Sequence, residues 1–258
     1  MLVTCPSGLS FNARKWKIGD RRNLHDQRII RGGLLMRKML EAADEGVEDP
    51  GPYDFEVGKP VPWANVSLTD IIDALIHIRI QTKPVLDYNE ICENCGAKLP
   101  VSIDLRDLEI TKMSADGKAH LSTGEPHVID VPINGEETIA QVKIKMLRGI
   151  DMPILTKHYK QDPTTASEVQ MVMHIVEITP PGQQTITQFR MIQKFFADQD
   201  WDFQTTLDEE IDKLGGGMRT QIDMECRRCN AEQQGTLPFG GEFFYPQRKG
   251  NTSSMATL

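Results

Sequence analysis

The sequence lacks the short motifs that identify the common nucleotide-binding and hydrolytic enzymes. It has no G-x-x-x-x-G-K-[ST] or G-x-G-x-x-G loop, no H-E-x-x-H and no G-x-S-x-G. Its six histidines are scattered without partner spacing. The acidic run from Asp208 to Asp212 is more typical of a solvated helix face than of a paired-carboxylate site. We therefore expect a protein that is not an enzyme.

Long apolar runs are also missing. No stretch of about 18 consecutive apolar residues occurs, so the sequence predicts no membrane span. The first residues do not show the charged and then apolar regions of a secretory signal. With 39% hydrophobic and 26% charged residues, the chain has the balance of a soluble globular protein, and we expect it in the cytoplasm.

Positive charge is scarce overall but concentrated near the start of the chain. The net charge is −8, yet residues 14–38 hold nine basic and two acidic residues, a local +7 that leaves −15 for the rest. Such a region could bind nucleic acid, but an acidic protein is repelled by a phosphate backbone. Binding to a partner protein or to the chain's own acidic surface is favoured. The basic candidates for partner binding are Arg14, Lys15, Lys17, Arg21 and Arg22.

Cysteine is rare, but four of the five cysteines form two C-x-x-C pairs. The pairs are Cys92 with Cys95 and Cys226 with Cys229. Four thiolates from two such turns are a typical ligand set for tetrahedral zinc. Gly96 and Asn230 follow the pairs, and both residue types tolerate the positive φ that such turns often need. We predict one structural Zn²⁺ site, because four sulfurs leave no coordination position open for water or substrate.

Other roles for these cysteines stay open at this point. Each pair could be a redox dithiol, although neither follows a βαβ pattern. Disulfides would require an oxidising compartment. His120 or His127, which lie between the pairs, could complete two separate metal sites. A single zinc ion would instead join distant parts of the chain and close a large loop.

Local patterns predict a mixture of helices and strands. An extended arm is expected over residues 10–17 and a basic helix over 24–43 that stops at Gly46, with a kink or close packing at Gly32 and Gly33. Ser67 should cap a second helix, with Asp70 three positions on. Further helices are expected over 162–178, from Thr185 or Thr187 to Phe196, and over 200–214, and strands over 85–91, 99–105, 128–133, 138–147 and 222–225.

These elements predict an α+β fold in which zinc-ribbon-like hairpins are joined by the Cys₄ site. We divide the chain into an N-terminal arm and basic helix (1–48), a linker rich in proline and glycine (49–66), a zinc-bound domain (67–246) and a flexible tail (247–258). Within the domain, the cysteine turns at 92–96 and 226–230 flank a helical and β-hairpin insertion at 106–218.

Two groups of apolar residues have alternative interpretations. Met36, Met39, Met171, Met173 and Met191 fall on helical apolar faces, where they either fill a core or form an adaptable binding surface. The aromatic residues after the second cysteine pair either pack on the zinc hairpins or dock a partner. They are Phe239, Phe243, Phe244 and Tyr245.

Three stretches of the sequence resemble a known family. They are CPSGLSFNAR at residues 5–14, ICENCGAKLPVSIDL at 91–105 and IDMECRRCNAEQQGTLPFGGEFFYP at 222–246. In this order, between Pro6 and Pro246, they resemble the baseplate hub assembly proteins, or tail assembly chaperones, of T4-like contractile-tailed bacteriophages. Cys5 stands where an apolar residue is expected, so we leave it out of the zinc site.

The resemblance implies a non-enzymatic role in building the baseplate hub or tail tip of a contractile tail. It implies other tail or hub proteins as partners, with homo-oligomer formation as an additional option. The expected location is the cytoplasm of the infected bacterium during virion assembly. The tail baseplate of the finished particle is a second possible location. The alternative is a zinc-ribbon nucleic-acid-binding protein that uses residues 14–38 together with Arg227 and Arg228.

Overall fold

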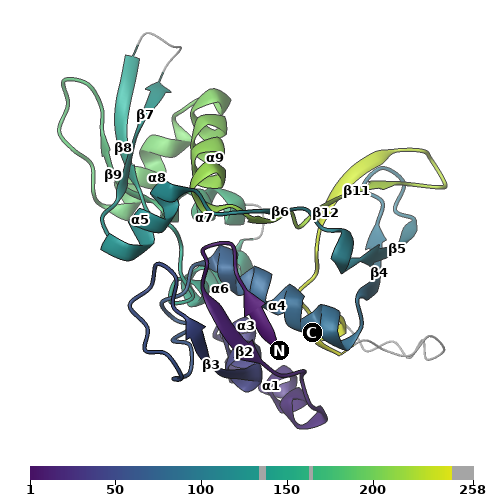
Figure 1. Ribbon diagram of the computed structural model, residues 1–258. Coiled ribbons are helices and arrows are strands. Elements are labelled where there is room, and N and C mark those ends of the chain that lie inside the picture. The colour runs from purple at the N-terminus through teal and green to yellow at the C-terminus, as the bar shows by residue number, and fades with distance from the viewer. Residues whose placement is uncertain (134–137, 163–164, 246–258) are drawn as a thin grey trace.

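The computed structural model describes residues 1–133, 138–162 and 165–245 (Figure 1). Every strand pairing in these ranges is antiparallel, and helices alternate with sheets along the chain. The predicted mixture of helix and sheet is confirmed. None of the helices in these ranges is both long and apolar enough to cross a membrane.

The N-terminal region begins with a sheet. Strands β1 (Leu2–Thr4), β2 (Ser10–Ala13) and β3 (Asp44–Asp49) pair in the order β1-β2-β3. The predicted arm at 10–17 therefore starts as the central strand of this sheet. Gly46, predicted to stop a helix, lies inside β3 with φ +117, and a Cβ there would meet the carbonyl oxygen of Gly58 at 3.2 Å. The helix stop at Gly46 was wrong, because the chain has already paired with β2.

The predicted basic helix over 24–43 is divided into short pieces. They are the 3₁₀ turn η1 (Ile18–Arg21) and helices α1 (Arg22–His25), α2 (Gln27–Arg31) and α3 (Leu35–Ala43). Gly33 has φ +67, and a Cβ there would lie 2.8 Å from the carbonyl oxygen of Met152 in helix α6 (Met152–Gln161). The break at the glycine pair is thus a point of close packing between α6 and the end of α2.

The predicted linker at 49–66 is a loop, but its side chains belong to the core. Tyr53, Val61 and Trp63 are buried, and the Trp63 ring meets the Phe11 ring edge-on at 5.0 Å between centroids. The Tyr53 hydroxyl donates a 2.6 Å hydrogen bond to Asp70. The segment is therefore not an exposed spacer, because burial of these rings joins the N-terminal sheet to the rest of the chain.

Helix α4 (Leu68–Thr82) lies at the centre of the molecule (Figure 1). As predicted, its N-cap is Ser67, whose hydroxyl accepts a hydrogen bond from the Asp70 amide. The main hydrophobic cluster, called here the α4 core, packs α4 against the N-terminal sheet, α3 and the C-terminal helix α10 (Gly241–Phe244). Asp70 is buried in it, and desolvation raises the pKa of its carboxyl group.

The segment between the cysteine turns contains a second hydrophobic core. Strands β7 (His127–Ile133), β8 (Thr138–Ile144) and β9 (Ile175–Thr179) form a sheet, covered by helices α7 (Ala166–His174), α8 (Phe189–Ala197) and α9 (Trp201–Gly215). The alternation along β8 is confirmed, because Ala140, Val142 and Ile144 are buried. Its Asn134-Gly135 turn lies outside the described residues.

Parts of this insertion differ from the prediction. The helix expected over 162–178 ends at His174, and the β-branched residues that follow form strand β9. Pro163, near the predicted start, lies outside the described residues. Helices α5 (Ala115–Thr123) and α6 were not predicted. At the base of the insertion, strand β6 (Ile110–Thr111) pairs with β10 (Gly217–Met218), which brings its two ends together.

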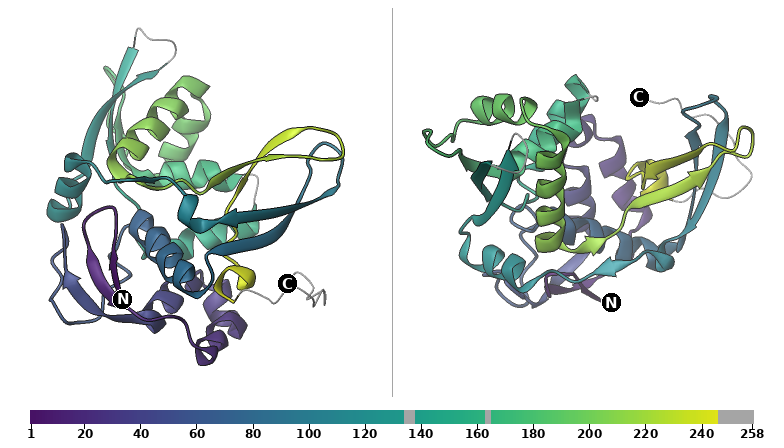
Figure 2. Two further views of the ribbon diagram at one scale, coloured as in Figure 1. Left: turned by 45° about the vertical axis from the view of Figure 1, so that its right-hand side comes forward. Right: turned by 90° about the horizontal axis from the view of Figure 1, so that it is seen from above.

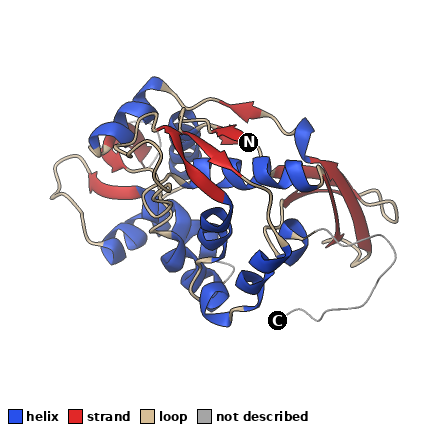
Figure 3. Ribbon diagram, turned by 60° about the horizontal axis from the view of Figure 1, so that its bottom comes forward, coloured by secondary structure: helices blue, strands red, loops and turns tan. Residues whose placement is uncertain are grey.

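Two hairpins leave the body side by side and form what we call the hairpin arm (Figure 2). One hairpin consists of β4 (Val85–Ile91) and β5 (Lys98–Asp104), the other of β11 (Gln221–Glu225) and β12 (Glu232–Thr236). The 3₁₀ turn η2 (Leu105–Asp107) follows β5. Strands β4, β5 and β11 match the predicted ranges closely, whereas β12 was not predicted, and in Figure 3 the hairpins lie at one end of the molecule.

Candidate metal centre

The two cysteine turns at the tips of the arm have the same backbone geometry. The Gly96 amide donates to the Cys92 carbonyl at 2.8 Å, and the Asn230 amide donates to the Cys226 carbonyl at 2.7 Å. Gly96 has φ +67 and Asn230 has φ +54, and Asn230 is the one positive-φ residue other than glycine among those described. The left-handed conformation predicted after each pair is confirmed. Each turn therefore directs both of its cysteine sulfurs to one side.

The four sulfur atoms meet at one point. All lie within 4.8 Å of one another, and the distances from Cys92 to Cys229 and from Cys95 to Cys226 are both 3.7 Å between Sγ atoms. Four sulfurs at about 2.3 Å from a tetrahedral zinc ion would be about 3.8 Å apart. A disulfide would require about 2.05 Å. The spacing therefore fits four ligands around one ion.

The remaining candidate ligands lie elsewhere. The His120 Nε2 atom accepts a hydrogen bond from the Met146 amide at 3.0 Å in the interior, and His127 begins strand β7 of the insertion. Two separate sites completed by histidine are therefore not formed. Cys5 is buried beside α4, with its Sγ atom 3.7 Å from the Asp70 carbonyl, and burial raises the pKa of its thiol. Cys5 therefore lies outside the cluster of four cysteines.

Two side chains that sequence reasoning missed support the centre. The Asn94 side-chain amide donates to Cys229 Sγ at 3.5 Å, which lowers the pKa of that thiol and favours the thiolate that metal binding requires. The Gln233 side chain accepts from the Glu93 amide at 3.1 Å and donates to the Ile91 carbonyl at 3.1 Å. Gln233 thus connects the hairpins directly. The only sequence signal for Asn94 was its position inside the first C-x-x-C pair.

The cysteine cluster occupies the tip of the arm, where few apolar residues are buried, whereas Leu86 and Tyr88 nearer its base belong to the α4 core. The small cluster at its tip consists of Cys92, Leu99 and Cys226, with the other two cysteines and two alanines packed around them. Cys92, Cys226 and Leu99 are buried, and Cys95 and Cys229 are partly exposed. So little apolar surface cannot hold two hairpins together without cross-links.

The predicted basic partner residues are largely free on the surface. Lys15, Lys17, Arg21 and Arg22 are exposed, whereas Arg14 forms an ion pair with Asp20 at 2.9 Å. The acidic run on α9, predicted as a solvated face, is confirmed as such, because its side chains are exposed or half-exposed.

The predicted aromatic docking residues are mostly buried. Phe243 and Phe244 have no exposed surface, and the Phe244 ring meets the Trp16 ring at 5.1 Å between centroids. Tyr245 donates from its hydroxyl to the Lys17 carbonyl at 2.7 Å, and its ring lies 5.3 Å below the Arg21 guanidinium. The docking role of the two phenylalanines was wrong, because both are interior. They close the α4 core, which also contains Leu86 and Tyr88 of the first hairpin, against the N-terminal region.

The comparisons found no related protein. No protein family, no curated protein and no solved structure matches this chain. The structure itself shows a protein of mixed helices and sheets with a cluster of four cysteines that could bind a metal ion.

Proposed function

We propose that this protein is a non-enzymatic assembly protein of a contractile phage tail, which binds other tail or baseplate hub proteins and contains one structural zinc ion. The observation that supports the structural metal is the convergence of four sulfurs from positions more than 130 residues apart in the chain. A shared ion there would fix the ends of a long loop.

Zinc is the ion that this ligand set favours. Four cysteine sulfurs are soft ligands, and their edge length of 3.7 Å suits a tetrahedral ion. All four positions would be filled by protein, so the ion would stabilise the fold and would not activate a substrate. Asn94 and Gln233 would then act as the outer layer that orients the ligands.

The tail role is supported by the family resemblance and by where its residues lie. The stretches 91–105 and 222–246 build the hairpin arm and the C-terminal helix, and 5–14 builds the start of the N-terminal sheet. The stretches 91–105 and 222–246 contain the four cysteines of the cluster. Phe243, in the stretch 222–246, packs in the same core as Phe11, in the stretch 5–14. The resembling residues thus shape the fold, whereas the insertion between them is free to carry contacts with partners.

The alternative function is nucleic-acid binding. In its favour, Arg227 and Arg228 are exposed at the tip of the arm, as are several basic residues of the region 14–38. Glu93, Glu225 and Glu232 are exposed on the same two hairpins and would repel a phosphate backbone. We therefore rank this function second.

The test is a binding assay with defined proteins. Purified, zinc-loaded chain is mixed with individual hub, tube and tape-measure proteins of a contractile phage, and complexes are detected by size-exclusion chromatography. We expect a complex of fixed stoichiometry and one zinc per chain. Absence of a complex with every tail component would overturn the tail role. Salt-sensitive binding to DNA or RNA would support the alternative instead.

A further inference from the structure

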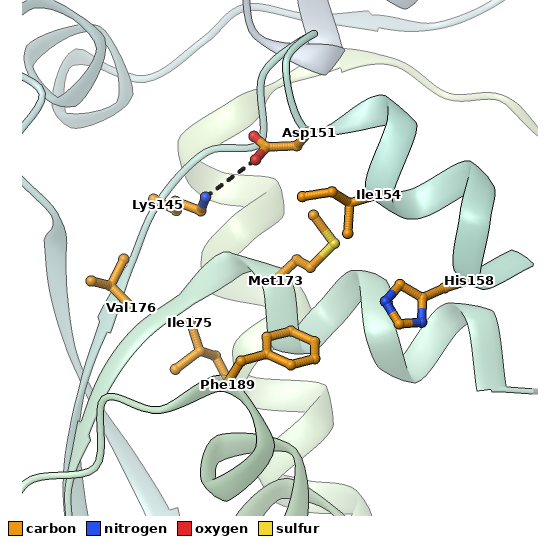
Figure 4. A pocket seen from close by; sticks show the side chains of 8 residues that line it. All are labelled: Lys145, Asp151, Ile154, His158, Met173, Ile175, Val176 and Phe189. Atoms are coloured by element: carbon orange, nitrogen blue, oxygen red, sulfur yellow. Dashed lines mark hydrogen bonds and ion pairs between the residues drawn. The ribbon is translucent and has the colours of Figure 1, made fainter. Parts of the chain in front are cut away.

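A pocket in the insertion was not predicted from the sequence. It has a volume of about 420 Å³ and lies between helix α6, the junction of α7 with β9, and the start of α8. Figure 4 shows the side chains of Ile154, Met173, Ile175 and Phe189 turned toward a common space, with His158 at one side. Its size and mostly apolar lining are those of binding pockets in general.

The apolar surface continues outside the pocket. Ile154 is 49% exposed and Phe189 is 38% exposed, so both belong to the rim as well as to the lining. Ile150, directly before Asp151 in the pocket wall, is 61% exposed. A pocket for a small molecule encloses its ligand, whereas an apolar rim of this kind indicates contact with a larger partner.

The charge around the pocket is positive although the chain as a whole is acidic. Helices α6 and α8, which form two of its walls, contain four lysine or arginine residues and no aspartate or glutamate: Lys157, Lys160, Arg190 and Lys194. All four are exposed. Inside the pocket, Lys145 is 41% exposed and its Nζ atom lies 3.4 Å from Asp151, a loose ion pair that leaves donor capacity for a ligand.

The positive surface extends into the N-terminal region. The Lys160 Nζ atom donates to the Ile30 carbonyl at 3.2 Å, which brings α6 next to α2. Arg31 on α2 is exposed, and Arg28 is exposed but forms an ion pair with Asp26 at 2.9 Å. On the other side of the pocket, Glu177 is occupied by an ion pair with Lys143 at 2.9 Å. A partner that follows this surface would therefore meet predominantly positive charge.

We propose that this pocket binds an acidic segment of a partner protein that places apolar anchor side chains between α6 and α8. The apolar lining would take the anchors, and the surrounding lysines and arginines would pair with carboxylates next to them. Nucleic acid is disfavoured, because it would use the positive charge but has no need of an apolar pocket. The proposal rests on the proposed function, since it names the surface with which an assembly protein would hold its partner.

The test uses a displayed library of random short peptides selected against the full, zinc-loaded chain. We expect the enriched peptides to combine net negative charge with at least two large apolar residues. Two variants then locate the site: Ile154→Asp at the rim, and Met191→Asp as a matched control, because Met191 is 50% exposed on α8 but does not line the pocket.

The expected effects differ between variants. Ile154→Asp should weaken the selected peptide about tenfold or more, because it places a charge where an anchor packs, whereas Met191→Asp should leave the dissociation constant within about twofold. The double variant Lys157→Glu with Arg190→Glu should weaken binding and reduce its salt dependence. Circular dichroism and zinc content check that each variant is folded.

Several results would overturn the proposal. They are the absence of any enriched peptide, enrichment of basic peptides, and an equal loss in Ile154→Asp and Met191→Asp. A fourth result would assign the surface to nucleic acid. In that case single-stranded DNA would bind well, and its binding would be lost in the double charge variant but unaffected by Ile154→Asp. These results would not bear on the binding assay with tail proteins. Conversely, if that assay failed while the selected peptide still bound, only the tail role would be overturned.

Discussion

The hairpin arm and the α4 core achieve stability in different ways. The arm, residues 85–104 and 221–236, has at its tip one buried leucine and four cysteines. The α4 core buries large side chains from the N-terminal sheet, the loop at 49–66, α4 itself and α10. Where apolar burial is extensive, separate parts of the chain hold one another. At the tip of the arm, where it is scarce, the zinc ion that we propose would provide the cross-link.

The largest expected effect is loss of the metal from the arm. Cys226→Ser removes a buried ligand, and a structural zinc site in a small domain supplies about 10 kcal/mol or more of folding free energy. We expect zinc content to fall from one ion per chain to none, and amide hydrogen exchange to accelerate in the arm while α4 stays protected. Metal analysis and exchange mass spectrometry measure both.

The matched control for this variant is Cys5→Ala. Cys5 is also buried but lies outside the cluster, so its replacement should leave the zinc content at one ion per chain. If Cys226→Ser kept its zinc, or if α4 lost its protection together with the arm, the contrast between the two regions would be refuted.

The second effect is expected in the α4 core. Phe243→Ala removes a fully buried ring that contacts Trp16 and Phe244, and should lower the free energy of unfolding by about 3–5 kcal/mol without changing the zinc content. Urea unfolding measures the change. Phe239→Ala, at a partly exposed neighbour, should cost less. Unchanged stability with lost partner binding would restore the docking role originally predicted for Phe243.

A third effect concerns stability at low pH, which should decrease for different reasons in the insertion and in the arm. Burial lowers the pKa of His174 to about 4, and its Nδ1 atom donates to the Lys145 carbonyl at 2.9 Å. The usual pKa of histidine is about 6.5, so between these values the unfolded state binds more protons. The contribution of His174 to the stability of the insertion is therefore complete above about pH 6.5 and decreases by about 3 kcal/mol as the pH falls toward 4.

His174→Asn should flatten this pH dependence, because asparagine can keep the hydrogen bond but does not titrate. Urea unfolding between pH 4 and 7.5 measures the slope, and His25→Asn at an exposed position is the control. Zinc content must be followed in parallel, since protonation of thiolates releases metal from the arm. An unchanged slope in His174→Asn would show that another group causes the acid sensitivity.

The smallest effect compares the two cysteine turns with each other. Gly96→Ala places a Cβ in open space but forces alanine into φ +67, which should cost about 1 kcal/mol. Asn230→Gly relieves the same conformation in the other turn and should be neutral or slightly stabilising. The rate of zinc transfer to a chelator measures both changes. If both variants changed the rate of zinc transfer in the same direction and by the same amount, the two turns would not carry the same backbone strain.

Prediction from sequence succeeded where the signal was local. Three of the four strands of the arm, the N-cap at Ser67, the helix over 200–214 and the positive φ after each cysteine pair follow from residue type and spacing. It failed where a neighbour in space overrode the pattern. Gly46 became part of a strand because β2 pairs with β3, and 175–179 became β9 because β8 offers an edge.

The sequence by itself determined which residues could bind a metal, since thiolate chemistry and the two-residue spacing are written in the chain. Only the tertiary structure decided that all four sulfurs face one point, that Phe243 and Phe244 are interior rather than interface, and that α6 and α8 enclose an apolar pocket with a basic rim. The physical reason is that ligand type is a property of single side chains, whereas convergence, burial and pockets depend on contacts between segments far apart in the chain.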